Sequence, residues 1–134
     1  QSEYPDGRLL VYSLDRFTEV ERTDISYTIP SDFDINEHFR SFYGVSSLSN
    51  AQPEIVQLRI DASQVKFFRT LPLHHSQEEI ETTDAYSVFQ YYLVPTFELT
   101  KEILSNGPYV EVLRPISLRE EIKSKAAKIA EMYK

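Results

Sequence analysis

The stretch "EIVQLRIDASQVKFFRTL", residues 54–71, decides the fold of this chain. Its first seven residues alternate in polarity, which is the pattern of a half-buried strand. Asp61 then stands where it can cap a helix over residues 62–71, with Gln64 three residues further on. Pro72 ends that helix, because the residue before a proline avoids the helical conformation. The apolar side of the strand consists of Val56, Leu58 and Ile60.

The chain after residue 71 continues to alternate between strand and helix patterns. Strands are predicted at residues 76–83, 86–94 and 109–113, and helices at residues 97–105 and 118–133. Thr96 is the expected N-cap of the first of these helices, and Ser117, in a capping box with Glu120, is that of the second. This order predicts an α+β fold, namely a ferredoxin-like β-α-β-β-α-β unit with helices on one face of its sheet and a C-terminal helix.

Residues 1–53 have a different pattern. Asp6-Gly7 is a hairpin-turn signal, and strands are predicted at residues 8–13, 16–22 and 25–30. A hairpin needs a strand on both sides of its turn. Either a very short strand pairs there, or the chain begins inside a domain whose earlier strands are missing, and the second interpretation is favoured. Asp34 can cap a helix over residues 35–44, and the small, polar residues 46–53 mark a boundary between two units.

Composition excludes several classes of function. The chain has 134 residues, 41% of them hydrophobic, with nine Tyr and eight Phe, so a packed core is expected. The absence of Cys excludes disulfides, thiolate nucleophiles and cysteine-ligated metals, and three glycines are too few for a phosphate-cradling loop. The net charge of −7 repels a phosphate backbone on average. No apolar run is long enough to span a membrane, which agrees with a cytoplasmic protein.

His74 and His75 are the first candidates for chemistry, because they stand side by side. Metal sites on helices use residues three or four positions apart, whereas adjacent residues on a helix or strand point in different directions. A structural turn is therefore favoured over a metal or catalytic site. In such a turn a histidine's donor and acceptor, or the Gln77 amide, would satisfy backbone groups.

Two further features of the sequence could carry chemistry. Glu79 and Glu81 are expected on one face of a strand and Glu78 on the other, but a solvated edge strand explains these acids better than an acid–base pair. Arg119 lies near a helix N-terminus, where a positive charge is unfavourable. It therefore needs an anionic partner, and an internal Glu or Asp is favoured over a ligand.

Several motifs together resemble one family. "LVYSLDRFTEV" (residues 10–20) and "FYGV" (42–45) resemble the end of a WYL domain. "LPLHHSQ" (71–77), "SNGPYVEVLRPISLREEI" (105–122) and "EMYK" (131–134) resemble the C-terminal extension of that domain. The resemblance implies that residues 1–45 are the remnant of a WYL domain, an Sm-like β-barrel, that residues 46–53 are a linker, and that residues 54–134 are the extension.

The resemblance also implies a function. The chain would be the ligand-sensing and dimerisation region of a bacterial transcriptional regulator, and not an enzyme. A winged helix–turn–helix upstream would make the DNA contacts, a second copy of the chain would complete a homodimer, and no cofactor or membrane is expected. The alternative is an accessory domain of an enzyme or defence complex that binds a small molecule or nucleic-acid fragment.

The candidate ligand contacts follow from the same resemblance. Arg16 matches the Leu-Asp-Arg motif of the family, although Leu10 and Ser13 stand where the family often has arginines. His74 and Arg119 match positions in the extension. The expected ligand is an anionic molecule or a nucleic-acid fragment, because the guanidinium fork can bind two oxygens of a carboxylate or phosphate. Catalytic residues and metal ligands are not expected.

Overall fold

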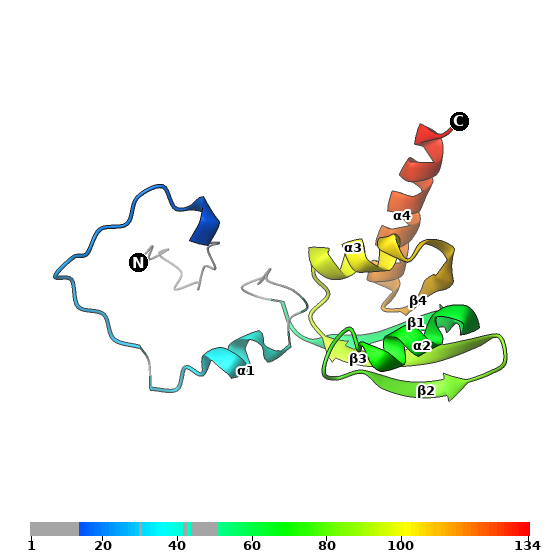
Figure 1. Ribbon diagram of the computed structural model, residues 1–134, viewed down its shortest axis with the longest axis horizontal. Coiled ribbons are helices and arrows are strands. Elements are labelled where there is room, and N and C mark those ends of the chain that lie inside the picture. Colours follow the sequence, from blue (N-terminus) through cyan, green and yellow to red (C-terminus); the bar gives the residue numbers. More distant parts are fainter. Residues whose placement is uncertain (1–13, 30, 42, 44–50) are drawn as a thin grey trace.

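The computed structural model describes residues 14–29, 31–41, 43 and 51–134 (Figure 1). In these residues the fold is mixed α/β, with one open antiparallel sheet in the order β2-β3-β1-β4. The strands are β1 (Glu54–Asp61), β2 (Glu78–Thr82), β3 (Tyr86–Leu93) and β4 (Val110–Arg114). The α-helices are α1 (Ile35–Arg40), α2 (Ala62–Thr70), α3 (Phe97–Ser105) and α4 (Ile116–Met132), and the short 3-10 helices are η1 (Leu14–Arg16) and η2 (Gly107–Tyr109).

Side-chain caps begin three of the helices, as the sequence predicts. The Asp34 carboxylate accepts hydrogen bonds from two backbone N–H groups at the start of α1. Asp61 accepts one from Ser63 at 3.0 Å in α2. Thr96 accepts one from the first turn of α3. Each bond satisfies a backbone donor that has no partner within its own helix.

The predicted Ser117 cap is wrong. Helix α4 begins one residue earlier, at Ile116, and its N-cap is Pro115, which makes no side-chain capping bond. A proline residue supplies a backbone torsion that suits the start of a helix without any side-chain bond. Ser117 therefore lies inside the first turn.

The core lies on one face of the sheet. The three apolar side chains of β1 have no exposed surface, and helices α2, α3 and α4 each contribute to the same buried cluster. All three helices therefore pack on the face that the alternation of residues 54–60 predicts. The cluster includes Val56, Leu58 and Ile60 from β1, Phe68 from α2, Leu99 and Ile103 from α3, and Leu118 from α4.

The opposite face of the sheet is polar. Gln57 donates a side-chain hydrogen bond to Gln90 at 2.8 Å across β1 and β3. Arg59 forms an ion pair with Glu111 of β4 and lies 5.3 Å from the centre of the Tyr86 ring. The Arg59 charge is thus compensated by Glu111, and the two amides satisfy each other beside Val88 on the same face.

A β-bulge changes the faces on which the acids of β2 lie. The pairing register shifts so that Glu79 lies opposite Phe89, whereas Glu81 lies opposite Val88. Because neighbouring residues of β3 point to opposite faces, Glu79 and Glu81 also lie on opposite faces. The prediction that they share a face is wrong, while β2 is an edge strand, as expected.

Residues 14–29 do not form the predicted strands. Leu14–Arg16 is a 3-10 helix, and no strand occurs in the rest of this segment. A strand needs a neighbour for its backbone groups, and no described segment pairs with this one. The predictions of strands at 16–22 and 25–30 are thus wrong for the described residues, and an Sm-like barrel is not confirmed. The strand predicted at residues 8–13 lies outside the described residues.

Helix α4 extends beyond its own core (Figure 1). Its apolar stripe starts at Leu118, which is 3% exposed, and continues to Ile129, Met132 and Tyr133, which are 45%, 78% and 84% exposed. Only the first part of this stripe is therefore covered by the sheet and α3. No helix in the described part of the chain is both long and apolar enough to cross a membrane.

Candidate functional site: a joint around His74

The turn between α2 and β2 is held together by Gln77. Its side-chain oxygen accepts hydrogen bonds from the Leu73 backbone N–H at 3.1 Å and from the Tyr91 hydroxyl at 2.8 Å. Its side-chain nitrogen donates to the Phe68 carbonyl at 2.8 Å. The Gln77 amide therefore links the end of α2, the turn and β3 through hydrogen bonds. The predicted structural role of "LPLHHSQ" is confirmed.

His74 is buried in this turn, with 9% of its surface exposed, whereas His75 is exposed. The Nε2 atom of His74 lies 2.8 Å from the Arg40 carbonyl oxygen. A carbonyl oxygen can only accept, so Nε2 carries the proton and donates. The Nδ1 atom accepts from the Ser76 hydroxyl at 2.7 Å and from the Ser76 backbone N–H at 3.2 Å. Both ring nitrogens are thus used in one tautomer of the neutral imidazole.

The environment of His74 favours that neutral form. Burial lowers its pKa below the usual value, and the neighbouring His75 ring, 4.0 Å away between centroids, lowers it further when charged. The Arg40 carbonyl acts in the opposite direction, but its effect is smaller. Protonation would place a hydrogen on Nδ1, where it would face the Ser76 N–H. A neutral His74 is therefore a condition for this arrangement.

Three backbone carbonyls of the preceding segment are held in the same way. Beside the Arg40 carbonyl, the Ser41 carbonyl accepts from the Val94 N–H at 2.7 Å, and the Tyr43 carbonyl accepts from the Thr96 hydroxyl at 2.6 Å. These contacts join the carbonyls of residues 40, 41 and 43 to His74, Val94 and Thr96, and we call them the His74 joint.

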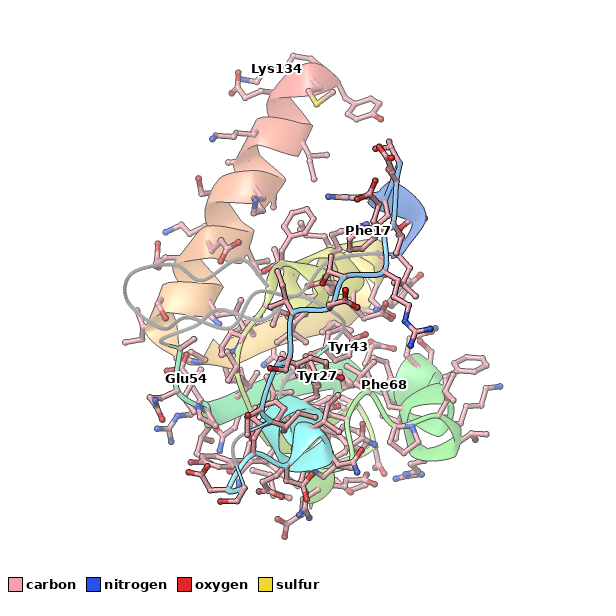
Figure 2. All side chains as sticks on the ribbon, turned by 90° about the vertical axis from the view of Figure 1, so that its left-hand side faces the viewer. Phe17, Tyr27, Tyr43, Glu54, Phe68 and Lys134 are labelled. Atoms are coloured by element: carbon pink, nitrogen blue, oxygen red, sulfur yellow. The ribbon has the colours of Figure 1, made fainter. Side chains whose placement is uncertain are left out.

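Tyr43 adds apolar contact to the joint (Figure 2). Its side chain packs against the core, and burial together with the charge of Glu102 raises its pKa. The end of α1 is therefore fixed to the four-stranded module by three hydrogen bonds and one aromatic contact.

Arg119 has an internal acidic partner, as predicted. One of its guanidinium nitrogens donates to Glu111 at 2.9 Å and to the Val112 carbonyl at 2.6 Å. Glu111 also pairs with Arg59, so one carboxylate serves two arginines. This triad ties the start of α4 to β1 and β4.

Arg16 is exposed at the end of η1. No hydrogen bond or ion pair within the described residues joins Arg16, His74 and Arg119 to one another. Ligand contact by these three residues stays a prediction. In the same residues no group of three or more His, Asp or Glu side chains is placed to hold a metal ion.

Sequence reasoning found His74 and Gln77 but missed their partners. The groups that His74, Val94 and Thr96 bind are backbone carbonyls of residues 40–43. Every residue has a backbone carbonyl, so the sequence does not distinguish these three carbonyls as hydrogen-bond partners. Only the Thr96 hydroxyl gave a signal, and that signal was its role as a helix cap.

The fold and the joint define a small α/β module fastened to the segment that precedes it. The family model of the WCX domain matches residues 52–130, which is more than half of the chain. The chain therefore belongs to the WCX domain family, the C-terminal extension found with WYL-domain regulators. This membership is consistent with a regulatory accessory domain. A search of the curated proteins found no match to the chain.

Proposed function

We propose that the chain is the ligand-sensing and dimerisation region of a transcriptional regulator whose winged helix–turn–helix lies upstream and binds DNA. The observation that carries this proposal is the match of residues 52–130 to the WCX domain, which accompanies WYL domains in regulators. Residues 1–45 would then belong to the WYL domain and residues 46–53 to a linker. The strand order β2-β3-β1-β4, with antiparallel neighbours throughout, supports a ferredoxin-like plan for the module.

The proposed mechanism is a shift between two domain arrangements. A ligand acts on an equilibrium only if it binds one arrangement better than the other. The His74 joint supports such coupling, because directional hydrogen bonds tie Arg40, Ser41 and Tyr43 to the turn before β2 and to the connection between β3 and α3. A ligand that changes the position of the upstream segment would alter these bonds and so the placement of the module.

Arg16 is the proposed main ligand contact, because its side chain lies in an exposed segment. An anionic ligand such as a nucleic-acid fragment would satisfy its guanidinium group with two oxygens. His74 and Arg119 already bind groups inside the fold, so their contribution to ligand binding would be secondary.

The test is a fluorescence-anisotropy titration of the chain with a short labelled single-stranded DNA of mixed sequence. We expect binding that weakens as salt is raised, because phosphate contacts release counterions. Arg16→Gln should weaken binding about tenfold, the loss expected for one charge-assisted contact. Arg22→Gln, in the same exposed segment, is the matched control and should have a smaller effect. Absence of binding, or equal effects of the two variants, would contradict the ligand part of the proposal.

A further inference from the structure

The C-terminal half of α4 presents an apolar stripe that nothing covers in the described residues. We call residues 122–134 the arm. Ile122 still packs against the core, but Ile129, Met132 and Tyr133 are 45%, 78% and 84% exposed. At about 1.5 Å per residue, the helical part of the arm, from Ile122 to Met132, is roughly 16 Å long. A stripe of this kind, continuous with a buried one, is typical of a helix that docks on another surface.

A groove of matching character lies between α2 and α3. Its volume is about 440 Å³, and Phe67 and Leu71 on its rim are 56% and 78% exposed. Most of its lining is apolar, which is the character of surfaces that receive amphipathic helices. The residues that line this apolar groove include Lys66, Phe67, Leu71, Leu73, Glu102 and Asn106.

The arm does not occupy the groove of its own chain. In both views α4 extends away from the sheet (Figures 1 and 2), and Figure 2 shows Lys134 at its tip with Phe68 of α2 far below. A rigid helix that is anchored at Leu118 cannot turn back onto α2. A second copy of the chain, in contrast, offers the same groove to this arm.

Charge also favours this pairing. The Glu102 carboxylate lies at the groove and forms no ion pair within the described residues. Lys128 stands one residue before Ile129 on the arm and likewise has no ion pair in that part of the chain. Lys66 lines the same groove on its α2 side, so the charges at this rim orient the arm, with Lys128 toward Glu102 and away from Lys66.

We propose that, in a homodimer, the arm of each copy lies in the apolar groove of the other copy. This inference rests on the dimerisation part of the proposed function and names the surfaces that form the dimer. The contact is reciprocal about a two-fold axis, so it closes with two copies and buries both stripes and both grooves.

The first test is the mass of the 134-residue chain by light scattering across a dilution series. We expect a dimer for the unchanged chain. Ile129→Asp on the arm and Leu71→Asp in the groove should each raise the dimer dissociation constant about tenfold or more, because each places a charge in an apolar contact. Ile116→Asp is the matched control, since Ile116 is 74% exposed on the same helix but lies outside the arm. It should leave the dimer unchanged.

A second test locates the contact. The chain has no cysteine, so single-cysteine variants can report which surfaces meet. Met132→Cys and Leu71→Cys should form a disulfide-linked pair when the two variants are mixed and oxidised. Cross-linking of Met132→Cys with itself alone would mean that the arms pair with each other, and it would overturn the proposal.

The outcomes separate this inference from the proposed function. A dimer that is unaffected by both aspartate variants overturns the arm-and-groove contact but leaves dimerisation standing. A chain that is monomeric at every concentration overturns both. Circular dichroism of each variant shows whether the fold is kept, which is expected because the substituted side chains are largely exposed.

Discussion

At the scale of single residues, two adjacent histidines have different roles. His74 donates to the Arg40 carbonyl and accepts from Ser76, whereas His75 is exposed. We expect His74→Ala to lower the free energy of unfolding by about 1–3 kcal/mol, because it leaves buried hydrogen-bonding groups without a partner. His75→Ala should change it by less than about 0.5 kcal/mol. Urea unfolding of the two variants measures the difference, and equal values would refute the structural role of His74.

His74 should also make stability depend on pH. Its pKa is lowered in the folded chain by burial and by His75, so the unfolded chain binds its proton more readily. The contribution of His74 is therefore intact above the usual histidine pKa and is lost as the pH falls below it toward the lowered folded pKa. Urea unfolding at several pH values should show this slope.

Two variants serve as controls for the pH dependence. His74→Gln should remove much of the slope, since glutamine does not titrate. His75 lies next to the His74 ring, with 4.0 Å between the centroids, and His75→Gln should leave most of the slope in place. A slope that is the same in all three proteins would show that other groups cause it.

The importance of His74 could be predicted from the sequence only in part. The prediction against a metal site rested on adjacent residues pointing apart in a helix or strand, whereas the pair lies in a turn with the two ring centroids 4.0 Å apart. Which of the two residues is buried came from resemblance to a motif, and geometry gave no preference. The histidine's partner, the Arg40 carbonyl, lies 34 residues earlier in the chain and carries no sequence signal.

At the scale of elements, Glu79 links the edge strand β2 to helix α2. Its carboxylate receives two hydrogen bonds from Arg69, at 2.7 and 2.9 Å, and one each from Ser87 and Thr82. The Arg69 bonds are the main cause that lowers the pKa of Glu79 to about 2. An acid this well satisfied stabilises the packing of the helix on the strand.

Glu79→Gln should therefore reduce stability by about 1 kcal/mol near neutral pH, a modest loss because Arg69 is half exposed. The folded pKa lies below the unfolded one, so the contribution of Glu79 is present above the usual glutamate pKa and is lost as the pH falls toward 2. Urea unfolding should show the difference between wild type and variant shrinking in acid. Glu78→Gln, at an exposed position of the same strand, is the control and should show little effect at either pH.

Most elements could be predicted because their signals are local. Alternation at residues 54–60 and the caps Asp34, Asp61 and Thr96 act within a few residues. The bulge after Glu79 could not be predicted, because it is a property of the pairing between β2 and β3. The Ser117 cap failed for a related reason, since Pro115 offered a competing start one residue earlier.

At the scale of the whole molecule, the order of elements in residues 54–134 was predictable and their connection to the upstream segment was not. The alternation of strands and helices allows few sheet topologies, and the observed antiparallel order is one of these. The segments in residues 16–30 that have a strand pattern, by contrast, can form strands only if another strand pairs with them. The described chain supplies no such neighbour, so the same kind of signal succeeded in one half and failed in the other.

The two edges of the sheet have a consequence for how copies of this module can associate. β2 carries three acids and a bulge, which oppose the addition of another strand. On β4, the Val112 carbonyl already accepts a hydrogen bond from the guanidinium group of Arg119. These features oppose the addition of a neighbouring sheet at either edge. Association through α4 can therefore stop at a discrete complex, because continued strand-to-strand addition into a fibre is disfavoured.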